Sequence, residues 1–432
     1  MERGLGTMQE INRRPLRVAF VCQWFPPEPG RLSIEIASAL NETPGFTVNV
    51  ITGVPNYPTG KVLPGYKAWK PMTEVISGMI VQRSPLFPSH DQSPLGRTLN
   101  YSSFAISAAI FGLKTLRSAD VSLVYSSPVT ASLPALFARI VFRTPYVAIV
   151  QDLWPDVVLD SGMISNKRLE SLIRRPLAYV SNLTYRHASH LFAITPGMRA
   201  DLINRGIKEN SVSVFYNWAP EEDSVPPPKS NLLHSQLGIS ATDLVLLYAG
   251  NMGSTHSLSS WVEAVAAMDH AIETDQSRRI QLVLIGSGVE KAKLKALVEK
   301  LNASNIHFLE RVDETAFQQC KADADAILVS LIDTPGLNTS LPSKVQSALA
   351  SGCIIVGSVK GDTAAVVSDA GGIVTADLDT KSILEALKIL LTQDGPSLQD
   401  RRIKARSYYD REMSKGTGLP KLINALRNYA AK

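Results

Sequence analysis

The chain has 432 residues, of which 45% are hydrophobic and 19% are charged. A single hydrophobic core rarely grows beyond roughly 250 to 300 residues, so this length predicts two domains. The composition is ordinary for a soluble globular protein, and no run of about 18 to 20 apolar residues predicts a membrane-spanning helix.

The N-terminal residues 1–17 lack the apolar segment of a secretory signal. The cysteines, Cys22, Cys320 and Cys353, are far apart and have apolar neighbours, which is typical of buried thiols in a reducing compartment. We therefore expect a cytoplasmic protein.

The net charge of +5 is unevenly distributed. Residues 1–219 contain 22 Lys and Arg against 14 Asp and Glu (+8), whereas residues 220–432 contain 22 against 25 (−3). The segment 167–186 carries basic residues among apolar ones at nearly helical spacing: Lys167, Arg168, Arg174, Arg175 and Arg186. Two interpretations are open for this segment, a surface that faces an anionic membrane and a solvated helix face.

Short apolar or β-branched runs alternate with longer amphipathic segments from residue 16 onward. The expected strands of the first half are residues 16–22, 47–52, 79–83, 121–125, 146–150, 190–194 and 212–216. Residues 219–231 interrupt the alternation with three consecutive prolines and a charge cluster, as an interdomain linker does.

The alternation then resumes with expected strands at 243–250, 280–288, 306–310, 326–331, 353–357 and 372–375. Residues 399–432 hold two amphipathic segments and no strand. We predict an α/β protein with two Rossmann-like, doubly wound domains at 15–218 and 232–398, a linker at 219–231, and C-terminal helices at 399–432 that pack back. Because ligands bind outside the carboxyl ends of such strands, two facing domains would form one cleft.

A glycine-containing turn follows the first expected strand of the second half. It places Gly250, Asn251, Gly253 and Ser254 before a helix, where backbone N–H groups form an anion-binding nest. The alternative is an ordinary strand-to-helix turn, since the spacing is not GxGxxG.

A second candidate site lies at residues 340–344, ahead of an apolar helix. Ser340 is expected to cap this helix with Pro342 in the first turn, which puts Ser343 and Lys344 at the positive end of the helix dipole. A cation is disfavoured there, so a bound diphosphate would explain Lys344. The alternative is a lysine that extends into solvent.

In the first half, Asp152 follows an expected strand directly and is a candidate to orient a substrate hydroxyl or to act as a base. The alternative is that it caps the next turn. The proline-rich loop at 23–31 carries Glu28 and Gly30 towards the same strand edge, or has only a structural role. The seven histidines show no metal-binding spacing, which favours metal-free chemistry.

Together these segments resemble the family 4 retaining glycosyltransferases of GT-B fold, especially the branch that assembles bacterial O-antigen, capsule and colanic-acid-like polysaccharides. The similarity extends from about residue 16 over nearly the whole chain. The matching motifs are a WFPPE-type loop (24–30), TGxPNYPxG (52–60), NYxSF (100–104), QDLWP (151–155), a PNW-like strand end (216–218), YAGNxG (248–253) and PSK (342–344).

The resemblance implies retaining transfer of a sugar from a nucleotide-sugar donor, with UDP as the expected nucleotide. The implied acceptor is a polyprenyl-diphosphate-linked saccharide, reached by peripheral association with the inner face of the cell membrane. Neither a cofactor, a metal nor a nucleic acid partner is expected. The candidate catalytic residues are Asp152, Lys344 and Glu28. The candidate donor-binding residues are Gly30, Gly250, Asn251, Gly253, Ser254, Ser287, Arg311, Ser343 and Lys344. Lys167, Arg168, Arg174 and Arg175 are expected to face the acceptor or the membrane.

Two departures from the family pattern stand out. Thr339 and Ser347 occupy the positions where many members carry a Glu-x7-Glu pair, and Gln151 stands where many have histidine. The charge of a diphosphate would then fall on Lys344 and Arg311. Two other functions use the same features: a UDP-sugar 2-epimerase of the same fold, and a non-catalytic scaffold that binds nucleotide sugars.

Overall fold

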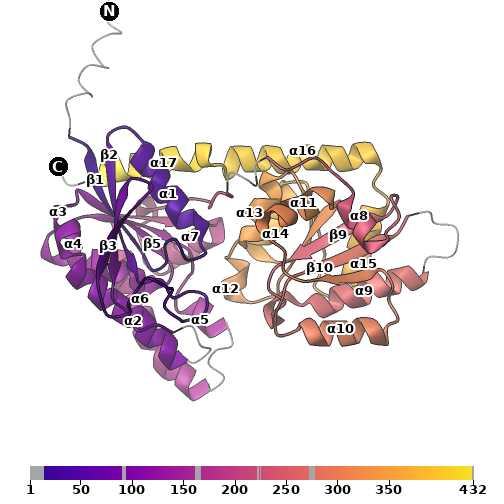
Figure 1. The fold of residues 1–432 in the computed structure, drawn as a ribbon, viewed down its shortest axis with the longest axis horizontal. Coiled ribbons are helices and arrows are strands. Elements are labelled where there is room, and N and C mark those ends of the chain that lie inside the picture. Colours follow the sequence, from indigo (N-terminus) through magenta and orange to yellow (C-terminus); the bar gives the residue numbers. More distant parts are fainter. Residues whose placement is uncertain are drawn as a thin grey trace, which may run out of the picture. The chain divides into compact units, whose positions relative to one another are not determined.

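The computed structural model describes residues 14–89, 94–160, 167–220, 223, 225–271 and 278–430. The chain divides into two units (Figure 1). One contains the residues up to Tyr216 together with Gly418–Lys432, and the other is Asn217–Thr417. The predicted boundary after residue 218 lies two residues from this division, and the predicted C-terminal tail is shared between the units.

The N-terminal unit has a sheet of eight strands in the order β3-β4-β2-β1-β5-β6-β7-β8. The strands are β1 (Leu16–Cys22), β2 (Phe46–Gly53), β3 (Met72–Ile76), β4 (Met79–Ser84), β5 (Val121–Ser126), β6 (Tyr146–Val150), β7 (His190–Ala193) and β8 (Val212–Val214). All seven predicted strands are present. The sequence analysis missed β3, an antiparallel partner of β4 at the sheet edge. The Ser77-Gly78 pair in the sequence indicates a two-residue hairpin turn between β3 and β4, and in the structure both residues have positive φ.

Helices α1 (Arg31–Glu42), α2 (Pro94–Phe111), α3 (Leu113–Ser118), α4 (Leu133–Val141), α5 (Asp156–Asp160), α6 (Lys167–His187) and α7 (Pro196–Asn204) belong to this unit. Helix α2 packs against α4, and α4 packs against α6. The crossover from β1 to β2 through α1 runs along the sheet in the opposite direction to the crossover from β5 to β6 through α4. Because crossovers between parallel strands are right-handed, α1 lies on the opposite face of the sheet from α4.

The C-terminal unit has a parallel sheet in the order β11-β10-β9-β12-β13-β14, which is the order of the dinucleotide-binding Rossmann fold. The strands are β9 (Leu244–Ala249), β10 (Ile280–Ile285), β11 (Ile306–Leu309), β12 (Ala326–Ser330), β13 (Ile354–Ser358) and β14 (Ile373–Val374), and each was predicted. The helices are α8 (Leu232–Leu237), α9 (Leu258–Ala271), α10 (Lys291–Lys300), α11 (Glu314–Asp323), α12 (Pro335–Asn338), α13 (Ser343–Ala350), α14 (Gly361–Asp369), α15 (Thr380–Leu391) and α16 (Gly395–Glu412).

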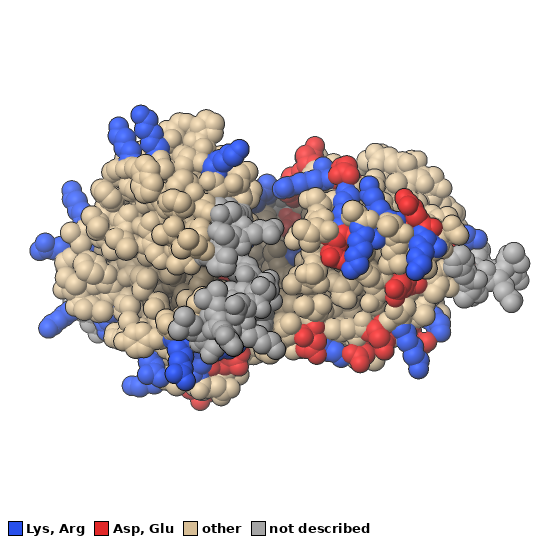
Figure 2. Space-filling view, turned by 90° about the horizontal axis from the view of Figure 1, so that it is seen from below, with Lys and Arg blue, Asp and Glu red and all other residues tan. Residues whose placement is uncertain are grey.

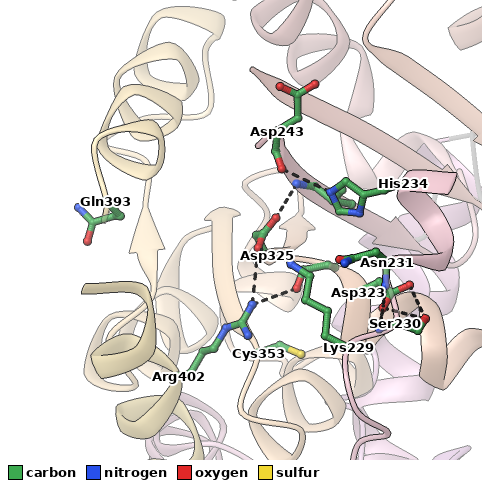
Figure 3. A network of polar contacts seen from close by, with 12 residues as sticks. Lys229, Ser230, Asn231, His234, Asp243, Asp323, Asp325, Cys353, Gln393 and Arg402 are labelled. Atoms are coloured by element: carbon green, nitrogen blue, oxygen red, sulfur yellow. Dashed lines mark hydrogen bonds and ion pairs between the residues drawn. The ribbon is translucent and has the colours of Figure 1, made fainter. Parts of the chain in front are cut away.

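The segment predicted as an interdomain linker, residues 219–231, belongs to the C-terminal unit (Figure 3). The carboxylate of Asp323 accepts hydrogen bonds from the backbone N–H groups of Ser230, Asn231 and Leu233. Lys229 lies 3.0 Å from Asp325. The prolines therefore lead into a segment that side-chain carboxylates hold in place.

Two features complete the fold. Helix α17 (Lys415–Tyr429) follows α16, and its Tyr429 ring stacks on His190 at the start of β7 with ring centroids 5.5 Å apart. In the described ranges, none of the helices is both long and apolar enough to cross a membrane.

Candidate functional site

The direction of the crossovers reverses between β9 and β12 in the C-terminal sheet. Ligands of open α/β sheets bind at this switch point, beyond the carboxyl ends of the strands. The loop after β9 contains Gly250 and Gly253, and the loops after β12 lead into α13 with Lys344. The topology thus brings together the two segments singled out as candidate phosphate sites.

The ammonium nitrogen of Lys344 is buried at this switch point, and no ion pair joins it to a carboxylate of the described residues. Its Nζ atom lies 4.1 Å from the centre of the Tyr248 ring and makes no hydrogen bond to any described residue. A Cβ added to Gly250 would lie 3.6 Å from the same atom, so the ammonium group faces the backbone of the glycine loop. Burial lowers the pKa of Lys344 from its ordinary 10.5 to about 8.

Helix α13 presents an uncapped N-terminus beside this lysine. It begins at Ser343 with Pro342 as its N-cap residue, and no side chain caps it. The prediction that Ser340 caps the helix is wrong, because the hydroxyl of Ser340 donates instead to the carbonyl of Leu337 at 2.9 Å. The residue before a proline is disfavoured in helical geometry, so Leu341 cannot extend the helix backwards. The N–H of Val345 donates to the carbonyl of Pro342 at 2.9 Å, which leaves the N–H groups of Ser343 and Lys344 for an anion.

The loops after β9 and β10 lie against each other. The N–H of Met252 donates to the carbonyl of Ser287 at 2.8 Å. A Cβ on Gly286 would lie 2.1 Å from the carbonyl oxygen of Gly250, and one on Gly288 would lie 2.4 Å from that of Met252. The sequence analysis named Ser287 but missed these two glycines, whose signal was the Gly-Ser-Gly triplet directly after a strand.

Replacing Gly286 with alanine should therefore destabilise the protein by more than about 2 kcal/mol, because the backbone has a φ of 134° and no room for a methyl group. Thermal denaturation measures the loss. Gly395→Ala is the matched control, since a Cβ there meets nothing within 4 Å. Equal melting temperatures for the two variants would contradict the close approach of the loops.

His256 joins the loops after β9 and β12. Its Nδ1 lies 3.1 Å from the carbonyl oxygen of Ser330, so Nδ1 carries the proton and donates. Burial lowers the pKa of His256, and the charge of Lys344 lowers it further. The site therefore holds a neutral imidazole next to a lysine that has no counter-ion, and an anion bound there would favour protonation of both.

The remaining candidates for donor binding differ in their contacts and in their exposure. Asn251 accepts a hydrogen bond from the Tyr248 hydroxyl through its carbonyl at 2.6 Å, and a Cβ on Gly253 would lie 3.1 Å from the Asn251 amide. Ser254 is exposed in the 3₁₀ turn Ser254–His256. Arg311 is exposed beyond β11, two strands from β9, and within the described residues no contact joins it to Lys344.

The N-terminal unit has its own switch point, between β1 and β5, and Asp152 lies next to it. The hydroxyl of Ser127, which follows β5, donates to Oδ2 of Asp152 at 3.0 Å. Burial raises the pKa of Asp152, and this hydrogen bond opposes the rise. The rings of Tyr101 and Trp154 meet edge to face nearby, with centroids 6.2 Å apart.

Glu28 holds two loops of this unit together. It is 4% exposed, and its carboxylate accepts hydrogen bonds from the backbone N–H groups of Asn56 and Tyr57, both at 2.8 Å. Burial raises its pKa to about 6. These contacts give Glu28 a positioning role, while its catalytic role stays a prediction. Gly30 is exposed and precedes α1 with a φ of 138°.

Arg83 is a residue of this unit that the sequence analysis missed. Its side chain is fully buried, pairs with Glu74 at 2.6 Å and donates to the carbonyl oxygens of Phe25 and Gly53. It fixes the proline-rich loop to β2. A single arginine at a strand end gave no sequence signal for this role.

Comparisons with known proteins place both units in one family. Residues 30–218 match the family described as "Glycosyl transferase 4-like domain", and residues 230–408 match "Glycosyl transferases group 1". The chain belongs to the family 4 glycosyltransferases and has the GT-B fold.

One curated relative and two solved structures illustrate the similarity. WcaI of Escherichia coli (strain K12), named as a glycosyl transferase of colanic acid biosynthesis, is 24% identical over 390 residues, which cover 89% of this chain and 92% of WcaI. A sucrose-phosphate synthase from Thermosynechococcus elongatus has a TM-score of 0.70 at 15% identity, with 96% of this chain and 98% of that one covered. Anabaena HepE in complex with UDP has a TM-score of 0.69 at 15% identity, with coverage of 96% and 100%.

The glycosyltransferase carries no carboxylate at the two positions of the family's Glu pair. The hydroxyl of Ser347 accepts a hydrogen bond from Lys321 at 3.1 Å, and Lys321 in turn forms a buried ion pair with Asp223 at 2.5 Å. Ser347 thus faces an ion pair that joins the start of the C-terminal unit to α11 and α13. Thr339 donates from its hydroxyl to the carbonyl of Gly336.

The basic residues predicted to face the membrane lie on α6 of the glycosyltransferase. Arg174 and Arg175 are exposed, and Arg174 lies 3.9 Å from Asp156. Lys167 and Arg168 lie in the first turn of α6, where the side chains are outside the described part. Within the described ranges, no three His, Cys, Asp or Glu side chains gather as metal ligands would.

Proposed function

We propose that this glycosyltransferase moves a sugar, with retention at the anomeric carbon, from a UDP-linked donor to a polyprenyl-diphosphate-linked saccharide. The product would belong to a bacterial surface polysaccharide. The observation that carries the donor assignment is the buried, unpaired ammonium of Lys344 between the Gly250 loop and the uncapped start of α13.

The chemistry of a diphosphate fits this arrangement. Its negative charge satisfies Lys344, and its oxygens accept from the N–H groups of Ser343 and Lys344 at the positive end of α13. As the glycosidic bond breaks, charge builds on the leaving diphosphate, and these donors are already in place to stabilise it. We propose that they do so without a metal ion.

The relatives support the choice of nucleotide and product. HepE is solved with UDP and with UDP-glucose, WcaI is named for colanic acid biosynthesis, and WaaG, a structure with a TM-score of 0.63 and 17% identity, is described as involved in lipopolysaccharide biosynthesis. To reach a lipid-linked acceptor, the enzyme would have to bind the cytoplasmic face of the membrane. The net positive charge of residues 1–219 is consistent with binding to anionic lipids.

A two-step assay tests the proposal. In a thermal-shift panel of nucleotide sugars we expect a UDP-sugar to raise the melting temperature, since a ligand at about 100 times its Kd stabilises by roughly 2.7 kcal/mol. That donor should then be consumed only when a polyprenyl-diphosphate-linked saccharide is added. Conversion of the UDP-sugar alone to its C2 epimer would show an epimerase instead, and binding without turnover on any acceptor would show a scaffold.

A further inference from the structure

Helix α2 exposes apolar side chains near both of its ends, with Ser102 and Ser103 between them. Leu95, Leu99, Ile106 and Ile110 are between 44 and 70% exposed. Their spacing of four, seven and four residues puts them on one face of the helix. The opposite face is also apolar, with Phe104 and Ala108 buried against the sheet. The four exposed side chains are therefore left largely uncovered by the described residues of the N-terminal unit, although α2 also carries polar residues such as Arg97, Ser102 and Ser103.

Helix α4, which packs against α2, extends the apolar surface. Phe137, Ile140 and Val141 are between 39 and 62% exposed, and Phe111 and Leu113 are exposed where α2 meets α3. We call these nine side chains the α2–α4 face: Leu95, Leu99, Ile106, Ile110, Phe111, Leu113, Phe137, Ile140 and Val141. A contiguous exposed apolar surface of this kind marks an interaction site.

The exposed charged residues of α3, of α4 and of the segment just after α4 are basic. Lys114, Arg117, Arg139 and Arg143 are exposed on α3, on α4 and just after α4. Between residues 94 and 151 the sequence contains one acidic residue, Asp120, which is buried and paired with Arg14 and Arg17. Figure 2, viewed from the side on which α2 lies in Figure 1, shows a broad uncharged surface on the N-terminal unit, with Lys and Arg along most of its margin and a few Asp or Glu side chains at its lower edge.

We propose that the α2–α4 face docks on an anionic lipid bilayer. Its aliphatic and aromatic side chains would enter the boundary between headgroups and acyl chains, while the four cations contact lipid phosphates. The charge pattern argues against a second copy of the chain as the occupant, since two such faces would bring eight cations together and the one carboxylate of residues 94–151 is buried. The link to a lipid-linked acceptor rests on the proposed function, whereas docking itself does not.

This assignment differs from the sequence-based one, which placed membrane contact on the basic residues of α6. Tyr179 is the one large apolar side chain that the described part of α6 exposes beside these cations, and Arg174 already has Asp156 as a neighbour. The α2–α4 face combines apolar area with charge, and a surface that does so keeps part of its affinity when salt screens the electrostatic attraction.

Flotation with vesicles tests the proposal without any sugar substrate, so its outcome is independent of the proposed function. The wild type should float with vesicles of phosphatidylglycerol and phosphatidylcholine, and weakly with phosphatidylcholine alone. The variant L99S/I106S/I110S should bind the mixed vesicles more than about tenfold less tightly. The matched control V289S/I389S/I403S changes three exposed apolar residues of the C-terminal unit and should bind like the wild type.

A second variant, with Lys167, Arg168, Arg174 and Arg175 changed to alanine, separates the two surfaces. It should retain binding to the mixed vesicles. Circular dichroism and thermal denaturation should show that every variant is folded, which the exposure of the side chains altered in the two triple serine variants favours. The proposal fails if L99S/I106S/I110S floats like the wild type, if the α6 variant alone loses binding, or if the wild type is a dimer that L99S/I106S/I110S converts to a monomer.

Discussion

Replacing Lys344 with alanine should weaken the binding of UDP by about 10- to 100-fold and leave the binding of uridine nearly unchanged. A charge-assisted hydrogen bond in a site shielded from water contributes roughly 1.5 to 3 kcal/mol, and only the diphosphate accepts it. Calorimetry with both ligands measures the difference. Lys293→Ala, which alters an exposed lysine of the same unit, is the matched control. Equal UDP affinity in the Lys344 variant and the wild type would contradict the assignment of Lys344 to diphosphate binding.

The same lysine should lower the stability of the ligand-free protein. Its pKa falls from 10.5 in the unfolded chain to about 8 in the folded one, so the unfolded chain binds the extra proton between these values. Stability therefore rises with pH across that window, and at neutral pH the buried cation costs on the order of 3 kcal/mol. Lys344→Met, which keeps the length of the side chain, should raise the melting temperature at pH 7 while weakening UDP binding. A lower melting temperature would mean that Lys344 is a structural residue.

The strands were predictable because each is a short apolar run between amphipathic segments, and in a parallel sheet such runs are buried on both faces. The carboxyl ends of the strands then indicated where to look for Gly250 and Asp152. Lys344 was recognisable because a cation stands at the wrong end of a helix dipole. These are local signals, each contained within about ten residues.

The residues that escaped prediction act over long sequence distances. Ser127 hydrogen-bonds to Asp152 across 25 positions, and Arg83 reaches the carbonyl of Phe25 across 58. Asp323 accepts a hydrogen bond from Ser230, 93 positions away, and no local feature of the proline-rich segment indicates this contact. The close approach of Gly286 to Gly250 likewise depends on which strands are neighbours. Only the fold supplies such pairings.

The solvent exposure of individual side chains could not be predicted from the sequence either. The second half of α2 is largely apolar, and this pattern does not reveal that Ile106 and Ile110 face outwards while Phe104 and Ala108 are buried. Charge, by contrast, is visible in a sequence, which is why the basic residues of α6 attracted the prediction of membrane contact. The α2–α4 face could be identified only once the burial of each side chain was known.

Asp152→Asn should leave donor binding within about twofold of the wild type and lower turnover by roughly 10²- to 10⁴-fold, the usual contribution of a positioned acid or base. Asparagine keeps the shape of the side chain and still accepts from Ser127, so only charge and basicity are lost. Titration with UDP and steady-state kinetics with a lipid-linked acceptor separate the two effects.

A second variant shows whether Asp152 acts as an ionised group. The hydrogen bond from Ser127 lowers the pKa of Asp152 against the effect of burial, so Ser127→Ala should raise that pKa. A base must be ionised, and activity is lost as the pH falls through its pKa. The acidic limb of the pH–rate profile should therefore move to higher pH in Ser127→Ala and be absent from the residual activity of Asp152→Asn. If the acidic limb of the pH–rate profile is unchanged in Ser127→Ala, or if Asp152→Asn has full turnover, Asp152 has only a structural role. That role would be to hold the loops after β5 and β6 together.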